Sequence, residues 1–268
     1  MARGRTTSHI NEDDMKRTLL IDGDVVAYKS AAVVEKGFDW GDGLWTLHAD
    51  EKEAIARLEA DIDDMLEKLE ATDAEIALTD SEGNWRKTVY PAYKSNRKAV
   101  RKPLVLRAMR QYLMDNFETR LRPTLEGDDI MGILATHSTL VQGEKIIVSI
   151  DKDMKTIPGL IYNPGREEEG IVSITREQAD RWHMFQTLTG DTTDGYPGCP
   201  SIGPKKADDI LSKCEAEGVP FWPAIVATYE RCGLTEADAL AQARVARICR
   251  AEDYDFKRKK VKLWNPPK

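Results

Sequence analysis

The feature that most constrains the fold is a set of apolar, strand-like segments that each lead into an acidic residue. Three such segments stand out: 18–21 before Asp22, 74–79 before Asp80, and 145–150 before Asp151. Apolar runs of this kind are typical of parallel strands covered on both faces. Because segments with helical periodicity separate them, the sequence predicts an α/β protein with a central, mostly parallel sheet flanked by helices.

The predicted helices fall between and after these strands. In the segment 50–71, apolar residues recur every three or four positions with acids between them, which indicates an amphipathic helix. Further helices are predicted at 103–117, 127–137, 175–188, 204–214, 221–229 and 235–249, with short strands at 161–163 and 171–174.

This pattern divides the chain of 268 residues into three parts. Residues 1–16 are polar and are expected to form a flexible tail. Residues 17–190 are expected to form the α/β core, and residues 191–268 a helical region with a C-terminal segment.

Composition restricts where the protein is expected to act. No apolar run approaches the roughly 18 residues of a membrane span, and the N-terminal tail lacks the apolar centre of a signal peptide. The four cysteines do not have zinc-ligand spacing, so they are expected to be reduced thiols. We therefore expect an intracellular, cytoplasmic protein that acts without a membrane, as a monomer.

The acidic residues gather in five short groups. They are Asp22-Gly23-Asp24, Asp80-Ser81, Glu126-Gly127-Asp128-Asp129, Asp151-Lys152-Asp153 and Asp191-Thr192-Thr193-Asp194. Each group alone fits a helix cap or a turn. Functional sites of α/β proteins form beyond the carboxyl ends of the strands, so these groups are expected to converge.

Carboxylates that converge in this way cannot all be ionised unless cations lie among them. Hard divalent cations with oxygen ligands suit such a site, and Mg²⁺ or Mn²⁺ fits best. Two ions roughly 4 Å apart would clamp the attacking and leaving oxygens of a phosphodiester. The acidic groups therefore favour metal-dependent phosphoryl chemistry.

The net charge of −7 argues against a nucleic-acid partner, but the charge is unevenly distributed. The window from Arg86 to Arg110 contains nine basic residues and no acid, and a second basic run spans Lys257–Lys262. Lys94 and Arg97 are spaced to share one helical face, from which they would stabilise charge on a phosphate. Tyr93 is expected to stack on an unpaired base.

The segment from Gly198 to Ala207 is the most specific local signal. A turn rich in Gly and Pro precedes a predicted helix start, and Lys205 and Lys206 follow it directly. Backbone N–H groups at such a start can bind phosphate, which suits contact with a duplex backbone that does not depend on base sequence.

Taken in order, these motifs resemble those of the flap endonuclease/5′→3′ exonuclease family, in particular the exonucleases of short-tailed lytic phages. The resemblance covers residues 19–264. It rests on the five acidic groups and on three further motifs: Asn84-Trp85-Arg86-Lys87, Tyr93-Lys94-Ser95-Asn96-Arg97-Lys98 and Gly195-Tyr196.

The resemblance implies a two-metal site whose ligands come from all five groups. Asp22, Asp80, Glu126 and Asp128 would hold the first metal, Asp151, Asp153, Asp191 and Asp194 the second, with Asp129 as a further acid of the cluster. Asp24 stands outside this ligand set. Lys94 and Arg97 would contact the scissile phosphate, and Asp153 would be essential for cleavage.

The resemblance also implies how DNA is held. The basic window, about 86–116, would form a helical arch through which a 5′ single strand passes. Gly198–Ala207 would be a helix-two-turn-helix motif with a bound potassium ion. The DNA contacts would be Tyr93, Lys94, Arg97, Lys98, Arg101, Lys102, Gly198, Ser201, Ile202, Gly203, Lys205 and Lys206. Substrates would be duplex DNA with a 5′ end or flap and RNA–DNA hybrids, in a bacterial host if the protein is phage-encoded.

Three other interpretations remain open from the residues. In a phosphatase of the haloacid-dehalogenase type, Asp22 would be phosphorylated with support from Lys94. That leaves the acids at 126–129 and 151–153, the basic window and the hairpin unexplained. A ribonuclease of the PIN type shares the core and the acids but usually lacks the arch and the hairpin. A non-catalytic DNA-binding protein would have little use for so many carboxylates.

Overall fold

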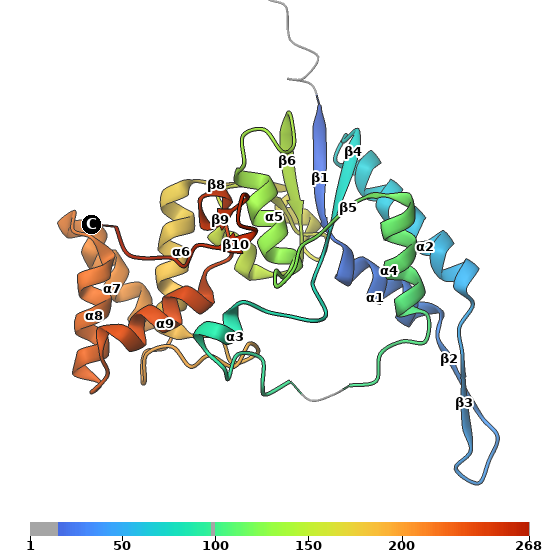
Figure 1. Ribbon diagram of the computed structural model, residues 1–268, viewed down its shortest axis with the longest axis horizontal. Helices are drawn as coiled ribbons and strands as arrows, with labels where there is room; N and C mark the ends of the chain where they lie inside the picture. The colour runs from blue at the N-terminus through green and yellow to red at the C-terminus, as the bar shows by residue number, and fades with distance from the viewer. Residues whose placement is uncertain (1–15, 98–99, 268) are drawn as a thin grey trace, which may run out of the picture.

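A six-stranded sheet forms the centre of the structure, a computed structural model that describes residues 16–97 and 100–267 (Figure 1). Its strand order is β5-β4-β1-β6-β7-β8, and only the β7–β8 pair is antiparallel. The strands are β1 (Arg17–Asp22), β4 (Asp73–Leu78), β5 (Glu118–Leu121), β6 (Glu144–Val148), β7 (Gly159–Tyr162) and β8 (Ile171–Ile174). The predicted fold class is confirmed.

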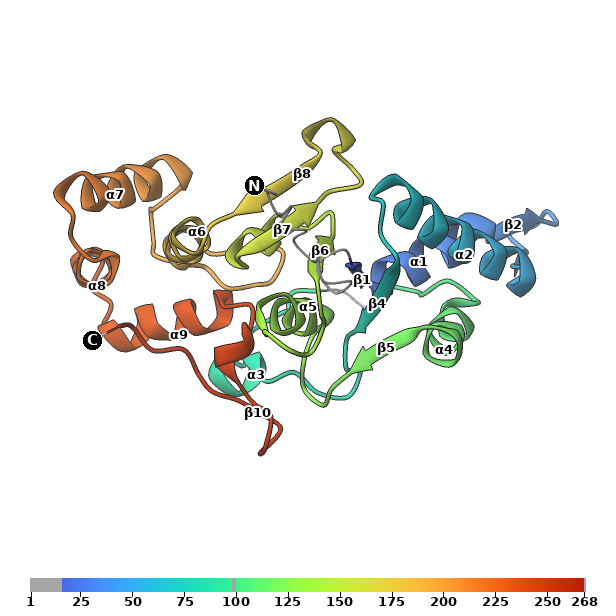
Figure 2. The same cartoon turned by 90° about the horizontal axis from the view of Figure 1, so that it is seen from above.

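Helices cover both faces of this sheet, as Figure 2 shows in a view from above. On one face α1 (Gly23–Val34), α2 (Glu51–Lys68) and α4 (Leu106–Asn116) pack against β1 and β4. On the other face lies α5 (Gly127–Thr136), together with the C-terminal segment that contains η4 (Ala251–Asp253). Because both faces are covered, the central strands are apolar throughout, and Leu19, Leu20 and Ile76 are fully buried.

The C-terminal helices pack together beside the sheet around a smaller core of their own. They are α6 (Arg176–Thr189), α7 (Pro204–Glu217), α8 (Phe221–Arg231) and α9 (Glu236–Ala246). Thr175 caps α6 with its side chain, as its sequence predicts, and Gly218 ends α7 in a left-handed conformation. No helix within the described residues combines the length and the apolar composition needed to cross a membrane.

Short elements complete the described chain. They are the one-turn helix α3 (Arg86–Val89), the 3-10 turns η2 (Lys152–Thr156) and η3 (Glu167–Glu169), the hairpin of β2 (Lys36–Asp39) and β3 (Trp45–His48), and the pair of β9 (Tyr254–Asp255) and β10 (Lys260–Val261). The β2–β3 hairpin, which was not predicted from the sequence, projects from the body between α1 and α2 (Figure 1).

The expected helical arch differs from what the structure contains. Between residues 86 and 105, α3 is the only helix among the described residues, and the described residues from 90 to 105 form turns and irregular backbone. α4 begins three residues after the expected start at Pro103. Lys94 has φ of +55°, which interrupts a right-handed helix, so Lys94 and Arg97 do not share a helical face. The tail before Lys16, and Lys98, lie outside the described residues.

Candidate active site

The acidic groups sit where strands end and turns or helices begin. Asp22 follows β1 and caps α1, since its Oδ1 accepts the N–H groups of Asp24 and Val25 at 3.0 and 3.1 Å. Asp151 lies beyond β6 and caps η2 in the same way, through the N–H of Asp153 at 2.8 Å. Because β1 and β6 are neighbours, capping brings these carboxylates to one edge of the sheet.

Asp24 has partners different from those of Asp22, because α1 begins between the two residues. Both oxygens of Asp24 are engaged: Oδ2 accepts the N–H of Thr79 at 2.8 Å, and Oδ1 pairs with the Arg110 guanidinium.

An open cleft of about 970 Å³ runs along this edge of the sheet. Acids from four of the five groups line it, together with basic side chains from several loops. The acids are Asp22, Asp24, Glu126, Asp128, Asp151, Asp153 and Asp194; the cations include Lys94, Arg97, Lys102, Arg110, Lys152 and Arg166. The cleft therefore joins the predicted carboxylate cluster to part of the predicted basic window.

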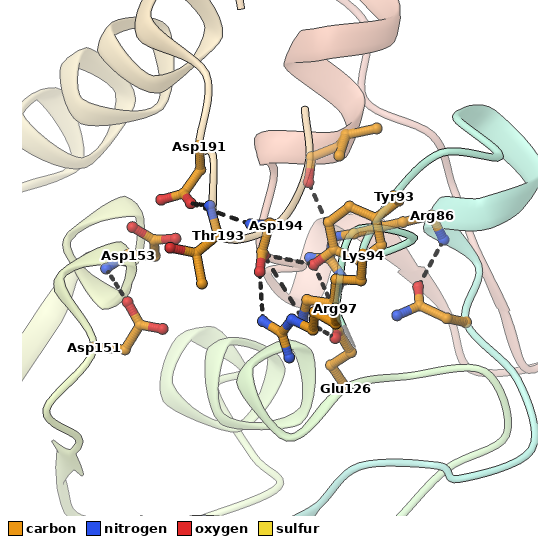
Figure 3. Close-up of polar contacts among 12 residues, drawn as sticks. Arg86, Tyr93, Lys94, Arg97, Glu126, Asp151, Asp153, Asp191, Thr193 and Asp194 are labelled. Carbon is orange, nitrogen blue, oxygen red and sulfur yellow. Dashed lines mark hydrogen bonds and ion pairs between the residues drawn. The ribbon is translucent and has the colours of Figure 1, made fainter. Parts of the chain in front are cut away.

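One half of the cleft joins the segment 93–97 to the loop at 191–194 (Figure 3). The Lys94 ammonium pairs with Glu126 and lies 3.6 Å from Asp194 Oδ2, and Arg97 pairs with Asp194 Oδ1 at 2.6 Å. The backbone is joined as well, since Lys94 N–H donates to the Asp194 carbonyl at 2.7 Å. Lys94 and Arg97 thus reach the carboxylates from a turn.

The loop at 191–194 is shaped by Asp191 and by Gly195. Asp191 Oδ1 accepts the N–H groups of Thr193 and Asp194 at 2.7 and 3.2 Å, which closes a tight turn. Gly195 has φ of +73°, and a Cβ there would lie 2.9 Å from Asn96 Oδ1. Only glycine allows this loop to approach the segment 93–97 so closely.

The other half of the cleft contains the acids that follow β6. Lys152 pairs with Asp191 at 3.1 Å, and the Gln186 amide on α6 donates to Asp153 Oδ1 at 2.6 Å. Figure 3 shows Asp151, Asp153 and Asp191 on one side of the site and Lys94, Arg97 and Glu126 on the other. α6 therefore supplies a polar side chain that fixes Asp153.

Crowding of the carboxylates raises several of their pKa values. Burial, followed by the charges of Asp151 and Asp191, raises the pKa of Asp153 to about 7. Burial and the charge of Asp151 raise the pKa of Asp22 to about 6, although the Val25 N–H opposes the shift. Burial and the charges of Asp22 and Glu126 raise the pKa of Asp128 well above its usual value. These directions indicate negative charge that the nearby cations do not fully offset.

Pairing with cations has the opposite effect at two acids. Burial opposes ionisation of Glu126, yet the charges of Arg86 and Lys94 hold its pKa below the usual value. The pKa of Asp191 is likewise lowered by Lys152 against the effect of burial. Arg86, Lys94 and Lys152 thus neutralise these two acids in this conformation.

The carboxylates of the cleft are candidate ligands for divalent metal ions. Within residues 16–97 and 100–267, no three acidic, histidine or cysteine side chains close around one point tightly enough to hold an ion in this arrangement. The acids of the cleft are oxygen donors, and the raised pKa values of three of them indicate unneutralised charge. Hard divalent cations therefore fit this donor set once the lysine and arginine contacts are exchanged.

Asp80 and Asp129 have surroundings different from those expected of metal ligands. The Asp80 carboxylate accepts the N–H groups of Thr124 and Glu82 at 2.7 and 3.0 Å, and it lies outside the lining of the cleft. Asp129 is fully buried, and Arg86 binds both of its oxygens at 2.8 Å. In this conformation Asp80 stabilises a loop, and Asp129 neutralises a buried arginine.

Arg86 was counted with the exposed basic window, but it is only 2% exposed. Its guanidinium also donates to Glu126 at 2.9 Å and to the carbonyls of Val245 and Arg247 at 2.9 and 2.7 Å. It therefore ties α5 to the end of α9. The indole N–H of the adjacent Trp85 also donates to Asp129 at 2.9 Å. A tryptophan next to Arg86 in the sequence is a signal that this arginine could be buried.

Tyr93 also differs from expectation. Its side chain is 2% exposed, and its hydroxyl lies 2.9 Å from Glu126 Oε2 and 2.8 Å from Asp194 Oδ2. The ring is thus unavailable for stacking on a base in this conformation. Tyr93 instead holds two acids of the cleft at a fixed separation.

Sequence reasoning gave no role to Arg110, Lys152 or Gln186. Lys152 could have been suspected from its place between two acids, and Gln186 from being a polar residue on the buried face of α6 with Ala179 and His183. Of the remaining predicted DNA contacts, Arg101 pairs with Glu35 at the rim, and Lys102 lines the cleft.

Residues 190–203 join α6 to α7 and contain turns at 192–195 and 200–201. Gly198 has φ of +66°, and a Cβ there would lie 2.3 Å from the Gly190 nitrogen. Both positions therefore need glycine, because their backbones lie in direct contact. Ser201 has φ of +62°, and Gly203 precedes Pro204, the first residue of α7. Ser201, Gly203, Lys205 and Lys206 are exposed, whereas Ile202 packs partly into the helical core. Gly198, also predicted to contact DNA, is buried, and its N–H donates to Gln242 at 2.9 Å.

Comparison with known proteins places this geometry in a family. The sequence model described as "5′-3′ exonuclease, N-terminal resolvase-like domain" matches residues 17–161, more than half of the chain. The chain belongs to the 5′-3′ exonuclease family and is a nuclease. The resemblance found in the sequence motifs is thereby confirmed.

Individual relatives agree with this assignment. The chain is 32% identical to the exodeoxyribonuclease of Enterobacteria phage T3, covering 94% of each chain. It is 33% identical to the exonuclease of Escherichia phage T7, covering 94% of this chain and 95% of the relative. It is 30% identical to the flap endonuclease Xni of Shewanella oneidensis, covering 62% of this chain and 65% of the relative.

Solved structures share the fold at low sequence identity. A bacteriophage T5 5′-exonuclease with bound zinc has a TM-score of 0.57 at 14% identity, covering 86% of this chain and 93% of that chain. A T5 flap endonuclease in a pseudo-enzyme-product complex with DNA and metal ions has a TM-score of 0.55 at 13% identity, with the same coverage.

Proposed function

We propose that the protein hydrolyses DNA from a 5′ end or at a 5′ flap, using divalent cations bound by the carboxylates of the cleft. The observation that carries this proposal is the raised pKa of Asp153, Asp22 and Asp128 within one open cleft that also contains Lys94 and Arg97. Crowded acids beside lysine and arginine side chains suit a site that takes up metal ions together with a phosphodiester.

Two sets of acids would hold the cations. Asp22, Glu126 and Asp128 form one set, and Asp151, Asp153, Asp191 and Asp194 form the other; Asp80 and Asp129 join only if the loops around them rearrange. When bound, Mg²⁺ or Mn²⁺ would make a nearby water more acidic and offset charge on the phosphate.

The side chains of the chain itself have separate tasks. Lys94 and Arg97, now paired with Glu126 and Asp194, would turn to the scissile phosphate and offset its developing charge. Their departure frees the same two acids for cations, so substrate binding and metal binding favour each other. Gln186 keeps Asp153 oriented through this exchange.

The remaining groups would hold DNA. The turn at 198–203, through exposed residues such as Ser201 and Gly203, and Lys205 and Lys206 would contact the duplex backbone, with a potassium ion at the turn. Residues 17–190, together with Asp191 and Asp194, would carry out cleavage. Arg101 and Lys102, in the irregular segment 90–105, would guide the 5′ strand. The enzyme would act as a monomer in the cytoplasm. It would also cut the RNA strand of RNA–DNA hybrids and so serve in primer removal, replication or recombination.

The test uses a duplex with a 5′ flap, labelled at the 5′ end in one sample and at the 3′ end in another. We expect early release of short 5′-labelled products with Mg²⁺ or Mn²⁺, loss of all cleavage with chelator, and no hydrolysis of a small phosphomonoester. Early release of 3′-labelled mononucleotides would contradict the polarity. Rapid phosphomonoester hydrolysis with intact DNA would favour the phosphatase interpretation.

A further inference from the structure

The turn between β9 and β10 carries a dense positive charge. Lys257, Arg258, Lys259 and Lys260 are consecutive and exposed, and Lys262 follows directly after β10. Figure 2 shows this turn projecting from the body on the side where α3 and α5 lie. None of its residues lines the cleft described above.

The turn is held in a defined shape. The Asp255 carboxylate accepts the N–H groups of Lys257 and Arg258 at 3.0 and 2.8 Å, and Lys262 N–H donates to the Asp253 carbonyl at 2.8 Å. Tyr254 is buried, so the base of the hairpin is anchored in the core. The basic side chains therefore project from a backbone that needs little further ordering on binding.

Lys259 adopts a conformation that lysine rarely has. Its φ is +54°, in the left-handed region where glycine or asparagine would sit with less strain. A lysine there costs about 1 kcal/mol relative to those residues. The chain nevertheless has lysine at this position, within a run of four consecutive basic residues.

Nearby acids leave this charge largely unneutralised. Asp253 pairs with Arg247 at 2.8 Å, and Asp255 is occupied by the two N–H groups, with Arg258 only at 3.9 Å. Among the described residues, Lys257, Lys259 and Lys260 have no ion-pair partner. The Arg122 guanidinium adds a further cation at the base of the turn, 5.5 Å from the Tyr254 ring centroid.

We propose that this basic turn, comprising Arg122, Lys257–Lys260 and Lys262, is a second DNA-binding site that contacts phosphates outside the cleft. The inference rests on the proposed function only in taking DNA as the substrate. A compact group of positive charges suits a phosphate backbone, and binding would not depend on base sequence. A protein partner fits less well, because Tyr254 and Phe256, the aromatic residues of the hairpin, face inward and leave no exposed anchor at the tip.

The test compares two variants with the same change in net charge. K257Q/R258Q/K259Q/K260Q removes the charges of the turn, and K36Q/K52Q/R57Q/K213Q removes three lysines and one arginine from exposed positions elsewhere. The equilibrium dissociation constant for a flapped duplex is measured by fluorescence anisotropy in chelator at several salt concentrations. For every phosphate that a variant no longer neutralises, the magnitude of the slope of log affinity against log salt falls by about 0.9.

We expect the magnitude of this slope to be smaller by about 2–4 in the turn variant than in the wild type. The slope of the control variant should stay near that of the wild type. The single-turnover cleavage rate at saturating enzyme should be unchanged in both, because the turn lies outside the cleft. Equal slopes for the two variants would overturn the inference, and so would a fall in the saturated cleavage rate. Failure of the wild type to bind or cut flapped DNA would instead count against the proposed function.

A single substitution separates charge from structure. Lys259→Asn removes a charge and relieves the strained φ, so it should raise thermal stability slightly while lowering the salt slope by about 0.9. If Lys259 had a structural role, the substitution would lower both the thermal stability and the magnitude of the salt slope. Loss of stability, or an unchanged slope, would contradict the proposal.

Discussion

Arg110, on the helix that follows the irregular segment 90–105, pairs with Asp24 in the first turn of α1. The same guanidinium donates to the Thr79 carbonyl at 2.9 Å, and Asp24 accepts the Thr79 N–H at 2.8 Å. Three elements, α1, the end of β4 and α4, are thus joined next to the carboxylates of the cleft. Asp24 thereby acquires a role that its proximity to Asp22 alone did not reveal.

This relationship predicts that Asp24→Asn and Arg110→Gln each lower the cleavage rate about 3- to 10-fold, since either change loosens α4 beside the site. The double variant should lose no more than the worse single variant, because both remove one interaction. The Mg²⁺ concentration for half-maximal cleavage should not move. Additive losses, or a shifted metal midpoint in Asp24→Asn, would instead make Asp24 a metal ligand.

The buried Arg86 network should dominate local stability. Arg86→Gln leaves Asp129 ionised in the core without a cationic partner, so the free energy of unfolding should fall by about 3–5 kcal/mol. Urea denaturation followed by circular dichroism measures this change. The neighbouring exposed Lys87 gives a matched control, since Lys87→Gln should stay within about 0.5 kcal/mol of the wild type. Similar small losses in both variants would show that the network contributes little.

The pH dependence of metal-free stability follows from the raised pKa values. The carboxyls of Asp22 (about 6) and Asp153 (about 7) hold their protons to higher pH in the native chain than in the unfolded chain. The native state therefore binds more protons between about pH 4 and 7, and the free energy of unfolding should fall as pH rises through this window. Glu126 and Asp191, whose pKa values are lowered, act in the opposite sense only below this window.

Thermal unfolding in chelator at pH 5 and pH 7.5 measures this effect. Asp153→Asn should reduce the loss between the two pH values, and Mg²⁺ should stabilise the wild type at pH 7.5 more than at pH 5, because protons compete with the cation. An Asp153→Asn profile parallel to the wild type would mean that Asp153 is not the group responsible.

Gln186 should act through Asp153. Gln186→Met keeps the length of the side chain but removes the donor 2.6 Å from Asp153 Oδ1, so the metal midpoint for cleavage should rise about 10- to 100-fold. DNA affinity in chelator should not change. Gln111→Met, on the exposed face of α4, is the matched control. An unchanged metal midpoint in Gln186→Met would leave Gln186 with a packing role alone.

The sequence predicted the parts of the fold that depend on local pattern. The apolar runs before Asp22 and Asp151 specify buried neighbouring strands, and the acids after them cap the next elements. Convergence of these acids follows from parallel strand order. Lys94 and Arg97 lie beside these acids in the structure, on a turn and not on the predicted helical face. Their contact with a phosphate stays a prediction.

The remaining features depend on partners distant in the sequence. Nothing near Asp129 indicates that Arg86, 43 residues earlier, occupies both of its oxygens, and nothing near Asp80 indicates that it binds the Thr124 N–H. Burial of Tyr93 similarly requires the loop that carries Asp194 to fold over it. Such contacts are set by tertiary packing, and motif spacing alone cannot distinguish a ligand from a structural acid.

The central claim, that the acids of this cleft support metal-dependent cleavage, is tested most directly at Asp153. Cleavage of a 5′-labelled flapped duplex is measured with wild type and Asp153→Ala, in Mg²⁺ and in chelator, alongside the dissociation constant for the same DNA in chelator. We expect the variant to bind DNA within about threefold of the wild type and to cleave it at least about 100-fold more slowly in Mg²⁺. Undiminished cleavage by the variant, or lost binding with the cleavage rate intact at saturating protein, would contradict the account.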